Sequence, residues 1–175
     1  MLFGDPKFFS VEAILEPGPE YSASLGKNVT GRFRLFFNGL EVGKFAEPCC
    51  VLRPLSEHLI TRCSIANSLW HDSLEGKSPN EWFAVLNDAL YLTEGLSFPK
   101  EYPLLDFLTN VSEGLNNVKG FAVAPPGKPL NVLLQLPESE VIHHHEIPLN
   151  IFCSVSAQFA SWIHDQEQQL NGVSE

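Results

Sequence analysis

The dipeptide Asn38-Gly39 constrains the fold of this 175-residue chain more than any other feature. It separates two runs, 28–37 and 40–45, in which apolar and polar side chains alternate, as is typical of half-buried strands. Asparagine and glycine best tolerate positive φ at both centres of a type I′ turn. The sequence therefore predicts a β-hairpin, with an earlier strand over 8–15 completing a three-stranded meander.

The middle of the chain is predicted to be helical. Ser78-Pro79-Asn80-Glu81 is a capping box with proline at the first helical position, and the apolar periodicity that follows it ends at Gly95. A helix over 54–70 is expected before it, and a shorter helix over 103–111 after it.

Strands return over 118–124, 130–136 and 140–146, and Pro148 begins a final helix that ends near Gly172. Hairpin-connected strands with helices segregated from them are typical of an α+β fold. We expect a single domain over residues 1–175. It should hold a mostly antiparallel sheet of about six strands, three N-terminal and three C-terminal, packed against about three or four helices.

Charge is unevenly distributed along the chain. The formal net charge is −10, and residues 1–62 hold seven of the 11 Lys and Arg residues and seven of the 21 Asp and Glu residues, so the acidic excess lies after residue 62. Such a field repels nucleic acid and speeds encounter with a basic partner, although acidity can also serve solubility alone. Because the sequence shows no signal-peptide pattern and no long apolar run, we expect a cytoplasmic protein with no membrane partner.

Motifs that would indicate an enzyme are absent from the sequence. It contains no G-x-x-x-x-G-K-[ST] or G-x-G-x-x-G loop to hold phosphate and no G-x-S-x-G elbow to present a nucleophile. The carboxylates also show no catalytic pattern. We therefore predict a protein without catalytic residues, metal or cofactor.

Three consecutive histidines, His143, His144 and His145, offer the alternative. On a strand, His143 and His145 share one face and could reach one cation, so the pair would suit a metal-binding protein or a metal-dependent enzyme. A third ligand would be needed, and the sequence identifies none. We expect instead that His143 and His145 face solvent, that His144 is partly covered, and that none has a chemical role.

Both ends of the chain resemble a known family. The opening L-F-G-D-P-K-F-F-S-V-E-A-I-L, the hairpin R-F-R-L-F-F-N-G-L-E-V-G and the late V-I-H-H-H-E-I-P-L are similar to bacterial immunity proteins of polymorphic toxin systems. The nearest fit is the immunity protein 42 family. This resemblance covers the strands at both ends and implies a non-enzymatic protein that binds and neutralises a cognate toxin. It assigns no contact residues and no oligomeric state.

A toxin partner would suggest where the acidity acts. Toxins that cleave nucleic acid are basic where they grip phosphate, so an acidic inhibitor would attract such a nuclease. The candidate partner-binding surface is the acidic side of the capped helix and its flanks, formed by Asp72, Glu75, Glu81, Asp88 and Glu94. Glu81 has a competing structural role in the capping box.

Overall fold

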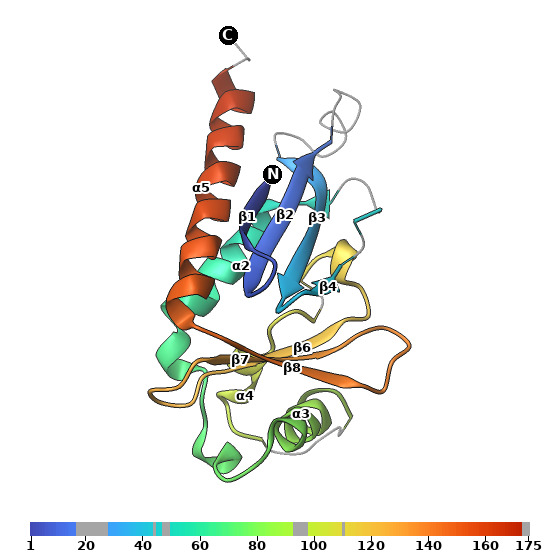
Figure 1. Cartoon of the computed structure of the whole chain (residues 1–175), viewed down its shortest axis with the longest axis vertical. Helices are drawn as coiled ribbons and strands as arrows, with labels where there is room; N and C mark the ends of the chain where they lie inside the picture. The colour runs from blue at the N-terminus through green and yellow to red at the C-terminus, as the bar shows by residue number, and fades with distance from the viewer. Residues whose placement is uncertain (17–27, 44, 47–49, 93–97, 110, 173–175) are drawn as a thin grey trace.

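The hairpin at Asn38-Gly39 forms as predicted. The computed structural model describes residues 1–16, 28–43, 45–46, 50–92, 98–109 and 111–172. Asn38 and Gly39 have φ angles of 47° and 85° and join β3 (Thr30–Phe37) to β4 (Leu40–Val42). On the other side, β2 (Phe9–Leu15) pairs antiparallel with β3, which completes the predicted meander (Figure 1).

Two further strands extend this sheet, which we call sheet A. β1 (Leu2–Asp5) pairs antiparallel with β2, and the short β5 (Cys50–Val51) pairs with the start of β3. Gly4 allows β1 to lie this close to its neighbours. Its φ is +86°, and a Cβ atom there would collide with the Phe9 carbonyl oxygen and with the side chain of Val155.

The C-terminal strands form a separate sheet, sheet B. It consists of β6 (Lys119–Val123), β7 (Leu130–Gln135) and β8 (Ile142–Ile147) in that order, all antiparallel. The predicted α+β class is confirmed, but the strands are divided five and three between two sheets instead of forming one sheet. Residues 130–134 of the central strand β7 are all buried, so both faces of the sheet are covered along this strand.

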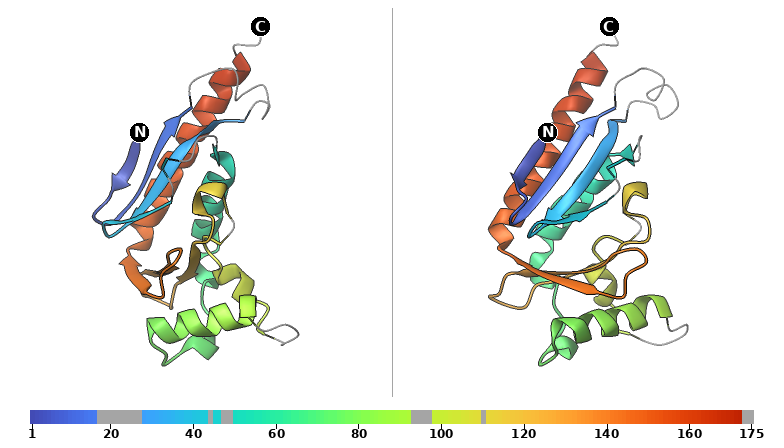
Figure 2. Two further views of the ribbon diagram at one scale, coloured as in Figure 1. Left: turned by 90° about the vertical axis from the view of Figure 1, so that its right-hand side faces the viewer. Right: turned by 45° about the vertical axis from the view of Figure 1, so that its right-hand side comes forward.

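Among the residues that the structure describes, two pairs of α-helices cover the sheets. α2 (Arg53–Ser64) and α5 (Leu149–Gly172) pack together beside sheet A, whereas α3 (Pro79–Asn87) and α4 (Tyr102–Leu105) lie on the far side of sheet B (Figures 1 and 2). Short 3-10 turns occur at Ala66–Ser68, Asp72–Leu74 and Glu113–Leu115. None of the described helices is both long enough and apolar enough to cross a membrane.

Two helix predictions were too long. α2 ends at Ser64, whose hydroxyl donates to the Thr61 carbonyl oxygen (2.8 Å), and not at residue 70. The helix expected over 103–111 is a single turn. Beyond it, Asp106 forms a β-bridge with Phe121, and the amide of Phe107 donates to the Gly120 carbonyl oxygen (2.7 Å). Pairing with the edge of β6 replaces the helical hydrogen bonds there.

Phe37 lies where the two sheets meet. It is fully buried, and its ring centroid lies 5.3 Å from that of Phe9, 6.2 Å from that of Phe107 and 6.3 Å from that of His145 on β8. Phe152 of α5 contacts both Phe9 and Phe107 from the helical side. One aromatic cluster therefore joins sheet A, sheet B and α5.

We expect Phe37→Ala to lower the free energy of unfolding by about 3–5 kcal/mol, because the lost ring leaves a cavity between layers that cannot close. Phe8→Ala is the matched control, since Phe8 is 50% exposed and its loss should change stability by no more than about 0.5 kcal/mol. Urea unfolding measures both. If both substitutions lowered the free energy of unfolding equally, Phe37 would not be the residue that joins the two sheets.

Candidate partner-binding surface

The capping box of α3 forms as predicted and fixes Glu81. The Glu81 carboxylate accepts hydrogen bonds from the backbone amide and the hydroxyl of Ser78, both at 2.7 Å, and the Ser78 hydroxyl accepts from the Glu81 amide at 3.4 Å. These bonds, the one from the Ser78 backbone first, lower the pKa of Glu81. Glu81 is therefore occupied by a structural role, although it remains exposed.

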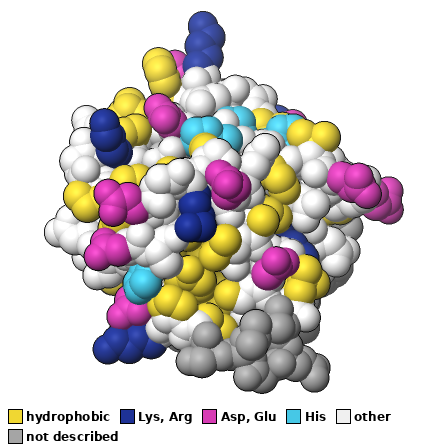
Figure 3. Space-filling view, turned by 90° about the horizontal axis from the view of Figure 1, so that it is seen from below, with side chains coloured by type: hydrophobic (Ala, Val, Ile, Leu, Met, Phe, Trp, Pro, Cys, Tyr) yellow, Lys and Arg dark blue, Asp and Glu magenta, His cyan; other side chains and the backbone are white. Residues whose placement is uncertain are grey.

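The other described members of the predicted acidic surface are free of such roles. Asp72, Glu75 and Asp88 are exposed, and Asp88 follows Glu81 by seven residues, which places both on one face of the helix. They lie on the lower face, by which we mean the exposed surface of residues 71–92 and 98–105. Figure 3 shows acidic side chains spread over this end of the molecule, with some basic ones among them. Glu94 lies outside the described residues.

α3 ends differently from the prediction. It passes into one π-helical turn, Asp88–Leu92, and the predicted end at Gly95 lies outside the described residues. In this turn the Tyr91 hydroxyl donates to the Asp106 carboxylate, and the Lys119 ammonium lies 5.5 Å from the centre of the Tyr91 ring. Lys119 also donates to the Asn87 side chain at 2.8 Å. These contacts attach the end of α3 to sheet B.

Exposed apolar side chains gather near this end of α3, and the sequence analysis missed them. They are Tyr91, Leu92, Phe98 and Leu104, of which Leu92 is the most accessible at 64%. The ring of Phe98 stacks on that of Tyr102, with centroids 6.4 Å apart, and the Tyr102 hydroxyl lies 2.7 Å from that of Ser73. The sequence pattern gave none of the four a place on the surface. Only their place at the ends of short elements could have distinguished them.

A half-buried polar cluster lies behind the lower face. Arg62 of α2 donates to the carbonyl oxygens of Leu104 and Asp106, the latter at 2.6 Å, and its Nε lies 3.3 Å from His58 Nε2. Burial, and secondly the charge of Arg62, lower the pKa of His58 to about 4. His58 is therefore neutral at physiological pH and accepts the hydrogen bond from Arg62.

The three histidines are oriented opposite to the prediction. His143 and His145 lie on the half-buried face of β8 toward Phe37, with parallel rings 6.4 Å apart. His144 is exposed, and its Nε2 lies 2.7 Å from Oδ1 of the Asn131 side chain. The prediction failed because sheet A covers the face that was expected to be open. Burial, followed by the charges of His143 and His144, lowers the pKa of His145. Within the described residues, no group of three His, Cys, Asp or Glu side chains could hold a metal.

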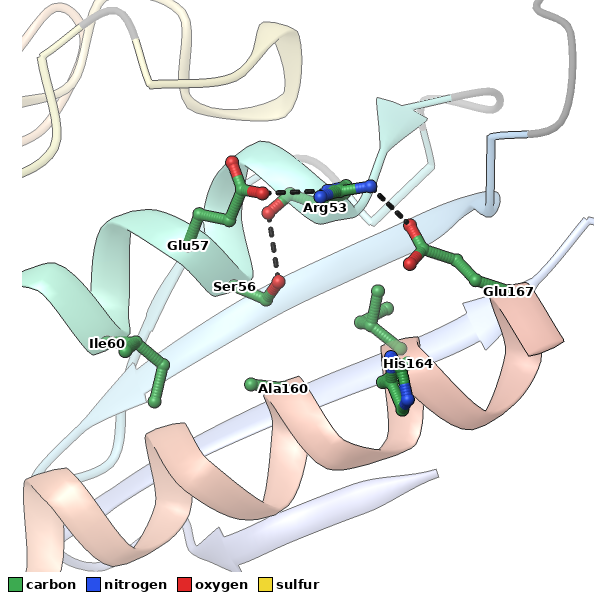
Figure 4. Close-up of a pocket in the computed structure, with 8 residues that line it drawn as sticks. Arg53, Ser56, Glu57, Ile60, Ala160, His164 and Glu167 are labelled. Atoms are coloured by element: carbon green, nitrogen blue, oxygen red, sulfur yellow. Dashed lines mark hydrogen bonds and ion pairs between the residues drawn. The ribbon is translucent and has the colours of Figure 1, made fainter.

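A groove between α2 and α5 has a volume of about 260 Å³ and contains a serine, a histidine and two glutamates (Figure 4). Arg53 spans it, paired with Glu57 at 2.7 Å and with Glu167 at 3.5 Å. The Ser56 hydroxyl donates to the Arg53 carbonyl oxygen at 2.9 Å, and no hydrogen bond joins Ser56 to His164. The pair of Arg53 on α2 with Glu167 on α5 therefore joins the two helices across this groove.

Comparison with known proteins gives two matches. The family model described as immunity protein 42 matches residues 1–162. The crystal structure of CdiI from Burkholderia dolosa AUO158 superposes with a TM-score of 0.65 at 15% sequence identity, covering 93% of this chain and 99% of the other. At that identity the second match shows a shared fold. Curated protein sequences give no significant match.

The half-buried His58 predicts how stability depends on pH. Its pKa is about 4 in the folded protein and about 6.5 when unfolded, so the unfolded chain binds more protons between these values. The free energy of unfolding should therefore be highest above pH 6.5 and should fall as pH is lowered toward 4. His58→Gln, which keeps a donor and an acceptor, should flatten this slope, whereas His164→Gln on the exposed face of α5 should not. Urea unfolding at several pH values tests this, and an unchanged slope in His58→Gln would contradict it.

Proposed function

The chain belongs to the immunity protein 42 family, whose members are non-enzymatic toxin inhibitors, and we propose that it neutralises a cognate toxin in the cytoplasm by binding it directly through the lower face. The family match over residues 1–162 carries this proposal, because immunity proteins bind cognate toxins. Inhibition by binding needs a complementary surface and no chemistry.

The composition of the lower face supports its role as the interface. Protein interfaces combine a central apolar area with a polar rim, and their affinity comes mostly from a few aromatic or apolar anchors. Here the exposed apolar residues Tyr91, Leu92, Phe98 and Leu104 share the lower face with the exposed carboxylates of Asp72, Glu75 and Asp88. Supported by Arg62 and by the Tyr91–Asp106 bond, this surface is held in place before any partner arrives.

The acidity suggests the class of toxin. Three carboxylates without structural duties, those of Asp72, Glu75 and Asp88, would attract a protein that is basic where it binds phosphate. A nuclease is such a protein. We therefore propose a basic nuclease as the cognate toxin.

The proposal is tested in cells by co-expression with the toxin domain encoded by the adjacent gene. Cells that produce the toxin and this protein should grow, whereas cells with the toxin alone should not, and the two proteins should purify as one complex. Phe37→Ala serves as the folding control, because a destabilised protein should protect less well. Continued killing together with the absence of a complex would refute the proposed function.

Charge reversal tests the role of the lower face. The triple variant Asp72→Lys, Glu75→Lys, Asp88→Lys should keep the Tm of the parent within about 2–4 °C, since exposed substitutions change stability little. It should bind the toxin more slowly, most visibly at low ionic strength, where screening is weakest.

The control for this variant changes the net charge equally at other exposed sites, through Glu138→Lys, Glu140→Lys and Asp165→Lys. Association rates measured by stopped-flow at several salt concentrations compare the two variants. If the lower-face variant associates as fast as the parent at low salt, the acidity serves only solubility.

A further inference from the structure

One edge of sheet B has no partner. β8 is an outer strand of that sheet, paired with β7 along Ile142–Ile147, and across the described residues no backbone group of another segment bonds to its other side. The two views in Figure 2 agree with this, because no element runs along the outer side of β8. An unpaired strand edge offers a row of amide donors and carbonyl acceptors to another chain.

The other edges are occupied or short. The far edge of sheet B is closed by the segment after α4, whose amides at Phe107 and Leu108 donate to the Gly120 carbonyl oxygen of β6 at 2.7 and 3.3 Å. In sheet A, β1 lies against α5 through Phe3, whose ring is 5.6 Å from that of Phe159, and β4 has three residues. β8, with six residues, is the longest open edge in the described part of the chain.

Common devices that protect an edge strand are also missing from β8. Its pairing with β7 runs in unbroken register over six residue pairs, so it has no bulge, and it contains neither proline nor lysine. Natural proteins usually protect long edges with such features. A sequence that leaves this edge open is consistent with a strand that pairs with a partner.

We propose that an extended segment of the toxin adds to sheet B as a fourth strand, hydrogen-bonded to the outer edge of β8. This inference rests on the proposed function and specifies how the toxin binds. α3 packs beside β8, so the added strand would run next to α3 (Figure 1).

Charge favours a toxin over a second copy of this chain as the occupant. Two copies joined at β8 would bring together two molecules of net charge −10. A basic segment would instead be attracted. On the exposed face of β8, Glu146 is the acidic residue, and opposite charges on neighbouring strands stabilise their pairing.

Hydrogen–deuterium exchange of the complex is the first test. The probe is the catalytically inactive toxin domain encoded by the adjacent gene. In the free protein the outward amides of residues 142–147 should exchange rapidly, and in the complex they should become protected. A complex that leaves these amides as exposed as before would overturn the inference while leaving the proposed function intact. Failure of the toxin to bind at all would overturn both.

Two proline substitutions provide the second test. His144 and His145 are neighbours, so the amide of one points to β7 and that of the other points outward. Of His144→Pro and His145→Pro, the one at the outward amide should keep a Tm near that of the alanine variant at the same position, because an edge strand tolerates proline there. That variant should bind the toxin about tenfold more weakly or worse, because a donor is lost and the proline ring obstructs pairing.

His144→Ala and His145→Ala are the matched controls, since they remove the same imidazoles and keep the amides. Unchanged affinity of the proline variant that keeps its Tm would contradict the inference. Light scattering gives the oligomeric state of the free protein. If the parent is a dimer and that proline variant is a monomer, β8 pairs with a second copy of this chain and not with the toxin, and the inference is overturned.

Discussion

The contact of Phe37 with both sheets is the interaction on which the rest of the molecule depends. Its ring touches Phe9 of sheet A, Phe107 of the segment after α4 and His145 of sheet B, three residues far apart in the sequence. Tightly packed interiors transmit small displacements, so this cluster fixes sheet B relative to sheet A. Sheet B in turn carries α3, because Phe83 of α3 packs on Phe121 of β6 with centroids 5.1 Å apart.

The groups that could perform chemistry are engaged in holding this structure together. His58 is a half-buried acceptor next to Arg62. Burial raises the pKa of the Cys63 thiol to about 12, so this thiol stays protonated and unreactive. Ser56 and Glu81 hydrogen-bond within their own helices. The lower face presents carboxylates and apolar rings to solvent, a combination suited to binding a protein.

The sequence predicted those features whose cause is local. Asn38-Gly39 specifies its turn through the φ angles of two residues, and Ser78 caps α3 through atoms three residues apart. The sequence also predicted that Asp72, Glu75 and Asp88 are exposed, because charged side chains on and beside an amphipathic helix face solvent. Their role in binding a partner stays a prediction.

Features decided by distant residues could not be predicted in this way. The exposed face of β8 depends on where sheet A lies, so the orientation of His143 and His145 was reversed. Residues 106–108 have an apolar pattern that fits a helix, yet they pair with β6 because an edge lies within reach. The apolar part of the lower face was missed for the same reason, since Leu92 and Phe98 are exposed only by the way α3 and α4 end. The division of the strands into two sheets also depends on contacts between residues far apart in the sequence.

Titration of the toxin's activity with the purified protein shows whether inhibition results from direct binding. If this protein inhibits the toxin by forming a tight complex, toxin activity should fall linearly. It should vanish near one molecule of this protein per molecule of toxin. Further addition of this protein should then change nothing, because all of the toxin is already bound. Full toxin activity in the presence of about a tenfold excess, or complete inhibition at a small fraction of one equivalent, would contradict inhibition by direct binding.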